Sequence, residues 1–211
     1  MTPKAVYWDM DGTLIDSEPL HLESLVFGLR SLGITAPPGL HDRILGVAAF
    51  PVYEMLRDEF GLRLSFEEWI PHKYTHYLEN APKLLARPGA LEIFRELKAQ
   101  GVAQAVVSNS DRMVVNANMA ALDLHEAGMR SIARNDVRNG KPDPEPYLRA
   151  AFLTGVDPAD SFVMEDSVPG TIAGLAAGMT TIFWPEAPQE GPQGALVANS
   201  ADDVRRYLGL N

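Results

Sequence analysis

Short apolar runs alternate with stretches of helical periodicity in the second half of the chain, from residue 88 onward. The runs are rich in β-branched residues and end in polar ones, which is typical of buried strands, whereas the stretches between them repeat apolar residues every three or four positions. A similar run lies near residue 5. The strands predicted in this way cover residues 5–8, 102–107, 131–133, 161–164 and 180–183. Strands alternating with helices indicate a parallel sheet with right-handed crossovers, so we predict an α/β fold with a Rossmann-like parallel sheet.

Residues 17–86 have a different pattern, because only helical spacing is found there and no convincing strand appears. Gly46 and Gly61 interrupt the helical stretches. We therefore predict an all-helical cap domain at 17–86, inserted into an α/β core domain made of residues 1–16 and 87–211. The aromatic residues of the insert are expected to form its own core rather than a substrate site.

Composition removes several classes of function. The 211 residues include no cysteine, which excludes disulfides, thiol nucleophiles and thiolate metal sites. The formal net charge of −10 gives no electrostatic basis for binding nucleic acid or an anionic membrane. No signal-peptide core and no membrane-spanning apolar run is found, so we expect a soluble cytoplasmic protein. Its oligomeric state cannot be read from the sequence.

Two carboxylates follow the first predicted strand directly. Asp9 and Asp11 are two positions apart, and Gly12 then breaks the run. Carboxylates this close repel one another unless a proton or a cation lies between them, and a hard ion such as Mg²⁺ is the simplest remedy. The alternative is an ordinary Asp-x-Asp-Gly turn.

Other polar clusters also follow strands. Ser108 and Asn109 come after the second predicted strand, and Glu165 and Asp166 after the fourth, while Lys141 follows the weak third strand through a loop. Taken singly, Ser108 could equally be a helix cap, as could Glu165 and Asp166. Lys141 could equally be a surface lysine in a loop. Because the carboxyl ends of parallel strands share one edge of the sheet, all of them together favour a single active site.

The order of these clusters resembles the four motifs of the haloacid dehalogenase superfamily. The segments that carry the resemblance are Asp9-x-Asp-Gly-Thr, Ser108-Asn109, Lys141-Pro-Asp and Glu165-Asp-Ser-x-x-Gly. The last two are similar to the branch that holds small-molecule phosphatases and β-phosphoglucomutases, and the helical insert looks like the cap of that branch.

The resemblance implies roles for the carboxylates. Asp9 would be the nucleophile that forms an aspartyl-phosphate, and Asp11 would protonate the leaving oxygen and then deprotonate the attacking water. Mg²⁺ would bind the Asp9 carboxylate, the Asp11 main-chain carbonyl and Asp166. Glu165 would support these ligands or reach the metal through water.

The resemblance also implies a phosphate site and a reaction. Lys141, Ser108 and Asn109 would bind the phosphoryl oxygens. We therefore expect an Mg²⁺-dependent phosphatase acting on a small phosphorylated metabolite, such as a sugar phosphate or a similar phosphomonoester. The main alternative is a β-phosphoglucomutase-like phosphomutase. A non-catalytic phospho-ligand or partner-binding module ranks lower, as does a dehalogenase, because dehalogenases of the family lack the second aspartate that Asp11 supplies here.

The helical insert offers less chemistry. His21 is the best candidate for a substrate contact, although packing between helices explains it equally well. The β-phosphoglucomutases carry a lysine before a cap glycine and an arginine three residues after it, and here those places hold Leu45 and Ala49. Arg43 lies on another helical face and is a poor substitute. This weakens the mutase hypothesis without excluding other cations, namely Lys73, Lys83 and Arg87.

Overall fold

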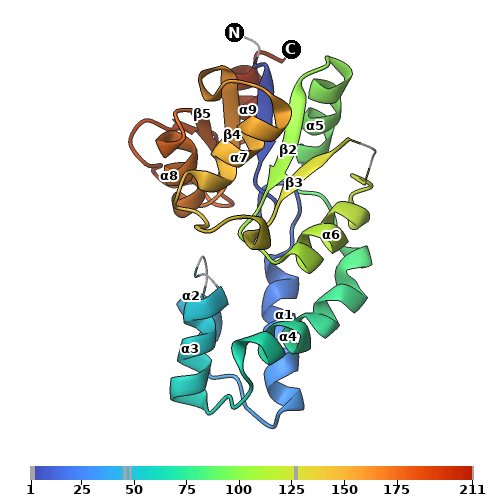
Figure 1. The fold of residues 1–211 in the computed structure, drawn as a ribbon, viewed down its shortest axis with the longest axis vertical. Helices are drawn as coiled ribbons and strands as arrows, with labels where there is room; N and C mark the ends of the chain where they lie inside the picture. Colours follow the sequence, from blue (N-terminus) through green and yellow to red (C-terminus); the bar gives the residue numbers. More distant parts are fainter. Residues whose placement is uncertain (1–2, 45–46, 48, 126–127, 211) are drawn as a thin grey trace. The chain divides into compact units, whose positions relative to one another are not determined.

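The computed structural model describes residues 3–44, 47, 49–125 and 128–210, which form two compact units (Figure 1). The sheet unit comprises Met1–Asp16 and Leu84–Asn211, and the helical unit comprises Ser17–Lys83. The second boundary therefore falls three residues earlier than the sequence predicts. The reason is that Asp16 N–H donates to the carbonyl of Leu85 at 3.0 Å and Ile15 forms an antiparallel bridge with Ala86, which fixes this segment to the sheet unit.

The sheet unit contains a parallel sheet whose described strands have the order β3-β2-β1-β4-β5-β6. This confirms the predicted α/β fold class. The strands are β1 (Ala5–Trp8), β2 (Ala103–Val107), β3 (Arg130–Ile132), β4 (Ser161–Glu165), β5 (Thr180–Phe183) and β6 (Leu196–Val197). The sequence did not predict β6, because two residues are too short to form a recognisable pattern.

Helices cover both faces of the sheet. Alternate residues of β1 point to opposite faces, so Val6 and Trp8 belong to one apolar cluster, and Ala5 and Tyr7 belong to the other. The first cluster includes residues from α5 (Ala90–Ala99), α6 (Arg112–Ala121) and α9 (Ala201–Leu208), and the second from α7 (Glu145–Thr154) and α8 (Val168–Ala176). Because β1 is buried on both faces, it is a continuous apolar run rather than an alternating one.

The helical unit consists of α1 (Glu18–Ser31), α2 (Leu40–Ile44), α3 (Ala49–Phe60) and α4 (Phe66–Asn80), followed by the short 3₁₀ helix η1 (Ala81–Lys83). Two further 3₁₀ turns, η2 (Arg134–Asp136) and η3 (Pro158–Asp160), belong to the sheet unit. A capping box begins α4, where Ser65 and Glu68 exchange side-chain and main-chain hydrogen bonds. No helix in the part of the chain that the structure describes is both long and apolar enough to cross a bilayer.

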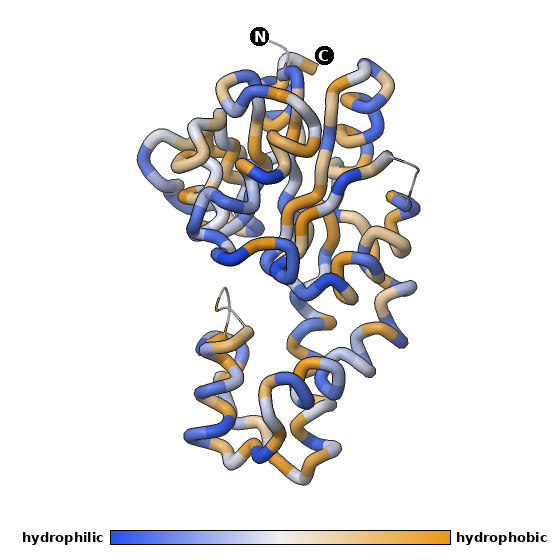
Figure 2. Tube along the Cα trace, viewed as in Figure 1, coloured by the Kyte–Doolittle hydropathy of each residue, from blue (hydrophilic) through white to orange (hydrophobic). Residues whose placement is uncertain are grey.

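The position of β1 in the middle of the sheet brings distant parts of the chain together. Trp8 is in register with Val106 of β2 and Met164 of β4, so Asp9 lies one step beyond this pairing, beside Glu165. Figure 2 shows apolar colours along the central strands and hydrophilic colours in the loops that follow β2 and β3. Polar side chains therefore gather at the carboxyl edge of the sheet, where open α/β sheets bind their ligands.

Candidate active site

The loop after β1 is held close to the loop after β4. Asp9 continues the strand ladder, because its N–H donates to the carbonyl of Met164 at 2.9 Å. Gly12 has a φ of +81°, and a Cβ there would lie 2.2 Å from Oδ2 of Asp166. Both the left-handed backbone and this close approach require glycine. The Asp-x-Asp-Gly segment therefore brings its main chain directly against the carboxylate of Asp166.

Lys141 connects two of the carboxylates. Its ammonium group donates to Oδ1 of Asp9 at 2.6 Å, to Oε1 of Glu165 at 2.5 Å and to the carbonyl of Val107 at 2.8 Å. Burial opposes the charge of Lys141, but Asp9 and Glu165 outweigh it and hold the pKa of the amine above its usual range. The three donors of the ammonium group are thus matched by three acceptors, in a site where only 8% of the residue is exposed.

Glu165 is fully buried, and both of its oxygens accept hydrogen bonds. Oε1 accepts from Lys141 and from the hydroxyl of Tyr147 at 2.6 Å, and Oε2 accepts from the hydroxyl of Ser167 at 2.9 Å. Burial, followed by the charge of Glu165, raises the pKa of Tyr147 well above its ordinary value, so the phenol stays a donor. Sequence reasoning missed Tyr147 because it occupies a core-facing position of α7 that reads as simply apolar.

Three carboxylates form the acidic cluster, which we define as Asp9, Glu165 and Asp166. One oxygen from each lies within 4.8 Å of the others. Burial and then Glu165 raise the pKa of Asp166 to about 7, and the same two causes raise the pKa of Asp9 well above its ordinary value. A cation would relieve both the burial cost and the repulsion, and an all-oxygen donor set suits a hard ion.

The acidic cluster does not offer its oxygens equally. Glu165 already accepts hydrogen bonds from three residues, Lys141, Tyr147 and Ser167, whereas Asp166 accepts at Oδ1 from the hydroxyl of Thr13 at 3.1 Å. Asp9 accepts from Lys141 at Oδ1. The residues therefore fit a divalent cation, with Asp9 and Asp166 better suited as direct ligands than Glu165.

Asp11 lies in a different environment from Asp9. Its Oδ2 accepts from the hydroxyls of Ser110 at 2.7 Å and Ser108 at 3.2 Å, and its Oδ1 accepts from the side-chain amide of Asn118 at 2.9 Å. The structure thus brings Ser108 to Asp11, two residues that the sequence placed in one site. It adds Ser110 and Asn118, which sequence reasoning had not selected.

The side chain of Asn109 is engaged with the lysine loop. Its Oδ1 accepts from the N–H of Lys141 at 2.9 Å, and its Nδ2 donates to the carbonyl of the same residue at 3.0 Å. A Cβ on Gly140 would lie 2.7 Å from that Oδ1, so the preceding glycine makes room for the contact. Asn109 therefore holds the main chain from which Lys141 reaches the acidic cluster.

Arg87 joins the loops that follow β1 and β5. Its guanidinium donates to the carbonyls of Gly12 at 2.9 Å, Trp184 at 2.6 Å and Pro185 at 2.8 Å, and it stacks 3.9 Å from the centre of the Trp184 ring. Burial lowers the pKa of Arg87, although Asp166 opposes this. No sequence pattern indicates this clamp, because main-chain carbonyls have no sequence signature.

His21 lies on α1 in the helical unit. Its ring centre is 4.5 Å from that of Tyr77 and 6.2 Å from that of Tyr74, both on α4. The packing between α1 and α4 therefore accounts for this histidine. Its role as a substrate contact stays a prediction.

The cations considered for a mutase also have partners. Arg43 pairs with Glu59 at 2.7 Å, Lys73 lies 4.5 Å from the centre of the Tyr74 ring, and Lys83 donates to Asn80 at 2.8 Å. Leu45 and Gly46, on which the mutase comparison depends, lie outside the described residues. The structure adds no cation at Ala49, where α3 begins.

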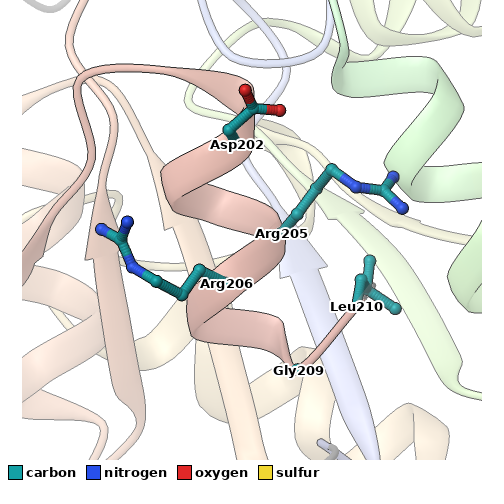
Figure 3. A pocket seen from close by; sticks show the side chains of 5 residues that line it. All are labelled: Asp202, Arg205, Arg206, Gly209 and Leu210. Carbon is teal, nitrogen blue, oxygen red and sulfur yellow. The ribbon is translucent and has the colours of Figure 1, made fainter.

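A separate hollow lies at the carboxyl end of α9 (Figure 3). It is lined by Asp202, Arg205, Arg206, Gly209 and Leu210. Its arginines are paired, Arg205 with Glu96 at 2.8 Å and Arg206 with Asp203 at 2.6 Å. The hollow shares no residue with the acidic cluster, and its paired cations make it a poor anion site.

A parallel sheet with an acidic cluster and a buried lysine at its carboxyl edge defines an α/β protein with a polar site suited to a hard cation, and comparison with known proteins identifies the family. Residues 6–184 match the family of haloacid dehalogenase-like hydrolases. The chain therefore belongs to the haloacid dehalogenase-like hydrolases, as its motifs predict.

Individual relatives agree with this assignment. A phosphorylated carbohydrates phosphatase from Thermotoga maritima is 30% identical over 181 residues, which cover 85% of this chain and 84% of that protein. The 6-phosphogluconate phosphatase of Escherichia coli is 28% identical over 195 residues, covering 90% and 86%. The structure of CbbY from Rhodobacter sphaeroides in complex with phosphate shares the fold, with a TM-score of 0.86 over 95% of each chain at 23% identity. The predicted enzyme class, a hydrolase of phosphoric monoesters, is confirmed.

Proposed function

We propose that this chain is an Mg²⁺-dependent phosphatase that hydrolyses a small phosphorylated metabolite through an aspartyl-phosphate on Asp9. The observation that carries the proposal is the contact of Lys141 with both Asp9 and Glu165 beside Asp166. A binding module needs neither a buried carboxylate nucleophile nor a buried lysine to hold it. The sugar-phosphate substrate class is supported by the named activities of the Thermotoga maritima and Escherichia coli relatives.

In the first half of the reaction, an oxygen of Asp9 attacks the phosphorus atom. The bond between phosphorus and the ester oxygen breaks, and its electron pair leaves with that oxygen, which takes a proton from Asp11. Lys141 holds Asp9 in place and adds positive charge beside the phosphoryl group. Ser108 donates its hydroxyl to a phosphoryl oxygen, and Asn109 keeps the lysine loop in position.

In the second half, water attacks the phosphorus of the aspartyl-phosphate and gives a proton to Asp11. The bond between Asp9 and phosphorus then breaks, which releases inorganic phosphate and restores the carboxylate. Mg²⁺ held by Asp9, Asp166 and the main-chain carbonyl of Asp11 would neutralise charge between the nucleophile and the anionic substrate. Glu165, bound by Tyr147 and Ser167, supports Lys141 from behind.

The test is a screen of the purified protein against phosphorylated sugars and related monoesters, with Mg²⁺ or with a chelator. We expect phosphate release from at least one ester, lost in chelator and restored by Mg²⁺. Acid-quenched samples should carry a phosphoryl adduct on the peptide that contains Asp9, detected by mass spectrometry. No release from any ester, or release without the adduct and without metal dependence, would contradict the proposal.

The phosphomutase alternative has its own assay. The protein is supplied with β-glucose 1-phosphate and a catalytic amount of glucose 1,6-bisphosphate. We expect free phosphate rather than glucose 6-phosphate, because Arg43 is exposed and paired with Glu59. Faster formation of glucose 6-phosphate would favour the mutase.

A cytoplasmic location also stays a prediction.

A further inference from the structure

Asn118 is a polar residue on an apolar surface of α6. It is fully buried, and the other buried residues of that helix are Val114, Val115 and Met119. A buried amide costs free energy unless it forms hydrogen bonds, so its partner explains its presence. Here Nδ2 of Asn118 donates to Oδ1 of Asp11 at 2.9 Å. The helix that follows β2 thus contributes directly to the environment of Asp11.

Ser110 holds the other oxygen of the same carboxylate. Its hydroxyl donates to Oδ2 of Asp11 at 2.7 Å, which is shorter than the 3.2 Å contact from Ser108. The N–H of Ser110 also donates to the hydroxyl of Ser108 at 2.9 Å. Donors on both oxygens restrict rotation of the carboxylate plane more strongly than donors on one oxygen.

We propose that Asn118 and Ser110 are positioning residues that orient the carboxylate of Asp11 for proton transfer to the leaving oxygen. The inference rests on the proposed function, in which Asp11 is the acid and base. Ser108 is shared between Asp11 and the proposed phosphate site, so it would turn to a bound phosphoryl group. Asn118 and Ser110 then keep Asp11 oriented after that contact is given up, because neither is assigned to the substrate.

The leaving group distinguishes this role from a merely structural one. An alkyl phosphate, such as the best sugar phosphate found in the screen, has a poor leaving group that needs a proton during P–O cleavage. 4-Nitrophenyl phosphate has a good leaving group that needs little protonation. The ratio of kcat/KM for the two esters therefore measures how much protonation by the general acid contributes to P–O cleavage. This ratio does not depend on the later hydrolysis of the aspartyl-phosphate, because kcat/KM does not include that step.

The test variant is Asn118→Leu, which removes the donor while keeping a similar side-chain shape. We expect kcat/KM for the alkyl ester to fall by about 10- to 100-fold and that for 4-nitrophenyl phosphate to change by less than about threefold. Ser110→Ala should show the same selectivity and serves as the second variant if Asn118→Leu does not fold. Asn116→Leu is the matched control, because it makes the same substitution at an exposed position of α6 and should change neither value.

A double-variant cycle shows whether Asn118 acts through Asp11. Asp11→Asn should itself be selective for the alkyl ester, and adding Asn118→Leu to it should not increase that selectivity. Equal losses for both esters in Asn118→Leu and Ser110→Ala, with Asp11→Asn still selective, would overturn this inference and leave the phosphatase proposal intact. An unselective Asp11→Asn, or no turnover of either ester by the unsubstituted protein, would overturn the proposed role of Asp11 and this inference with it.

Discussion

The polar groups of the sheet unit and of the helical unit are arranged in opposite ways. At the carboxyl edge of the sheet, the side chains of Lys141 and Glu165 are 3% and 0% exposed, and their ion pair joins the loop of Lys141 to the end of β4. In the helical unit, the ion pair of Arg43 and Glu59 is 42% and 49% exposed. The buried groups there are mainly aliphatic, together with the aromatic residues Trp69, Tyr74 and Tyr77 of α4.

This contrast explains which part of the function can be read from the sequence. A buried charge must be paired and hydrogen-bonded, so residues at the sheet edge depend on one another and form recognisable motifs. Exposed pairs contribute little, and other residues can replace them without breaking a network. The residues proposed to carry out the reaction can therefore be recognised from the sequence of the sheet unit. The sequence of the helical unit contains no pattern that identifies the substrate.

The largest expected effect tests the sheet edge directly. Asp9→Asn should lower phosphatase turnover by about 10³-fold or more, because it removes the proposed nucleophile and one proposed metal ligand while keeping the side-chain volume. Asp16→Asn, at an exposed position of the same loop, is the control and should keep normal turnover. Circular dichroism should show an unchanged fold for both. Near-normal turnover by Asp9→Asn would contradict the covalent mechanism.

A smaller effect is expected from the clamp formed by Arg87. Arg87→Lys keeps the charge but loses the planar fork that reaches three carbonyls and stacks on Trp184. The loop that holds Gly12 should then be less well fixed, and affinity for Mg²⁺ should fall by about 10-fold. Mg²⁺ titration followed by the melting temperature measures this without a substrate. Unchanged affinity would limit the clamp to a packing role.

The acidic cluster should also make stability depend on pH. The pKa of Asp166 is raised to about 7 in the folded protein, so the folded state binds its proton more tightly than the unfolded state does. The resulting stabilisation is fully present below about pH 4 and is lost as the pH rises through about 7.

Melting temperatures in chelator should therefore differ between pH 6 and pH 8.5. Asp166→Asn should be more stable than the unsubstituted protein at pH 8.5 by several degrees, at about 2–4 °C per kcal/mol for a chain of this size, and the gain should shrink at pH 6. Added Mg²⁺ should stabilise the unsubstituted protein more at pH 8.5. If the gain in melting temperature of Asp166→Asn were equal at both pH values, the assigned rise in the pKa of Asp166 would be contradicted.

The smallest effect is expected in the helical unit. Arg43→Ala removes an exposed pair with Glu59, and the free energy of unfolding should change by less than about 0.5 kcal/mol. Urea unfolding measures this difference. A loss several times larger would mean that the exposed pairs of this unit matter more than the comparison suggests.

Much of the fold could be predicted because buried parallel strands are continuous apolar runs with clear ends. The predicted positions of Asp9, Glu165 and Asp166 at one sheet edge follow from the same pattern, and the structure brings their oxygens together. The rest had no local signal. Tyr147 and Asn118 occupy core-facing positions of helices, and their polar atoms find partners only across the fold.

The central position of β1 has a consequence for biosynthesis. Ala5 pairs with Ala103 on one side and with Ser161 on the other, so β1 is synthesised before both of its neighbours and lacks the second one until the chain extends beyond residue 161. The contacts between α1 and α4 lie within residues 17–83, so they can form before the partner strands of β1 have been synthesised. Translation stalled just before residue 161 should therefore yield nascent chains in which β1 lacks its β4 neighbour and exposes that edge, and we expect chaperones to bind them.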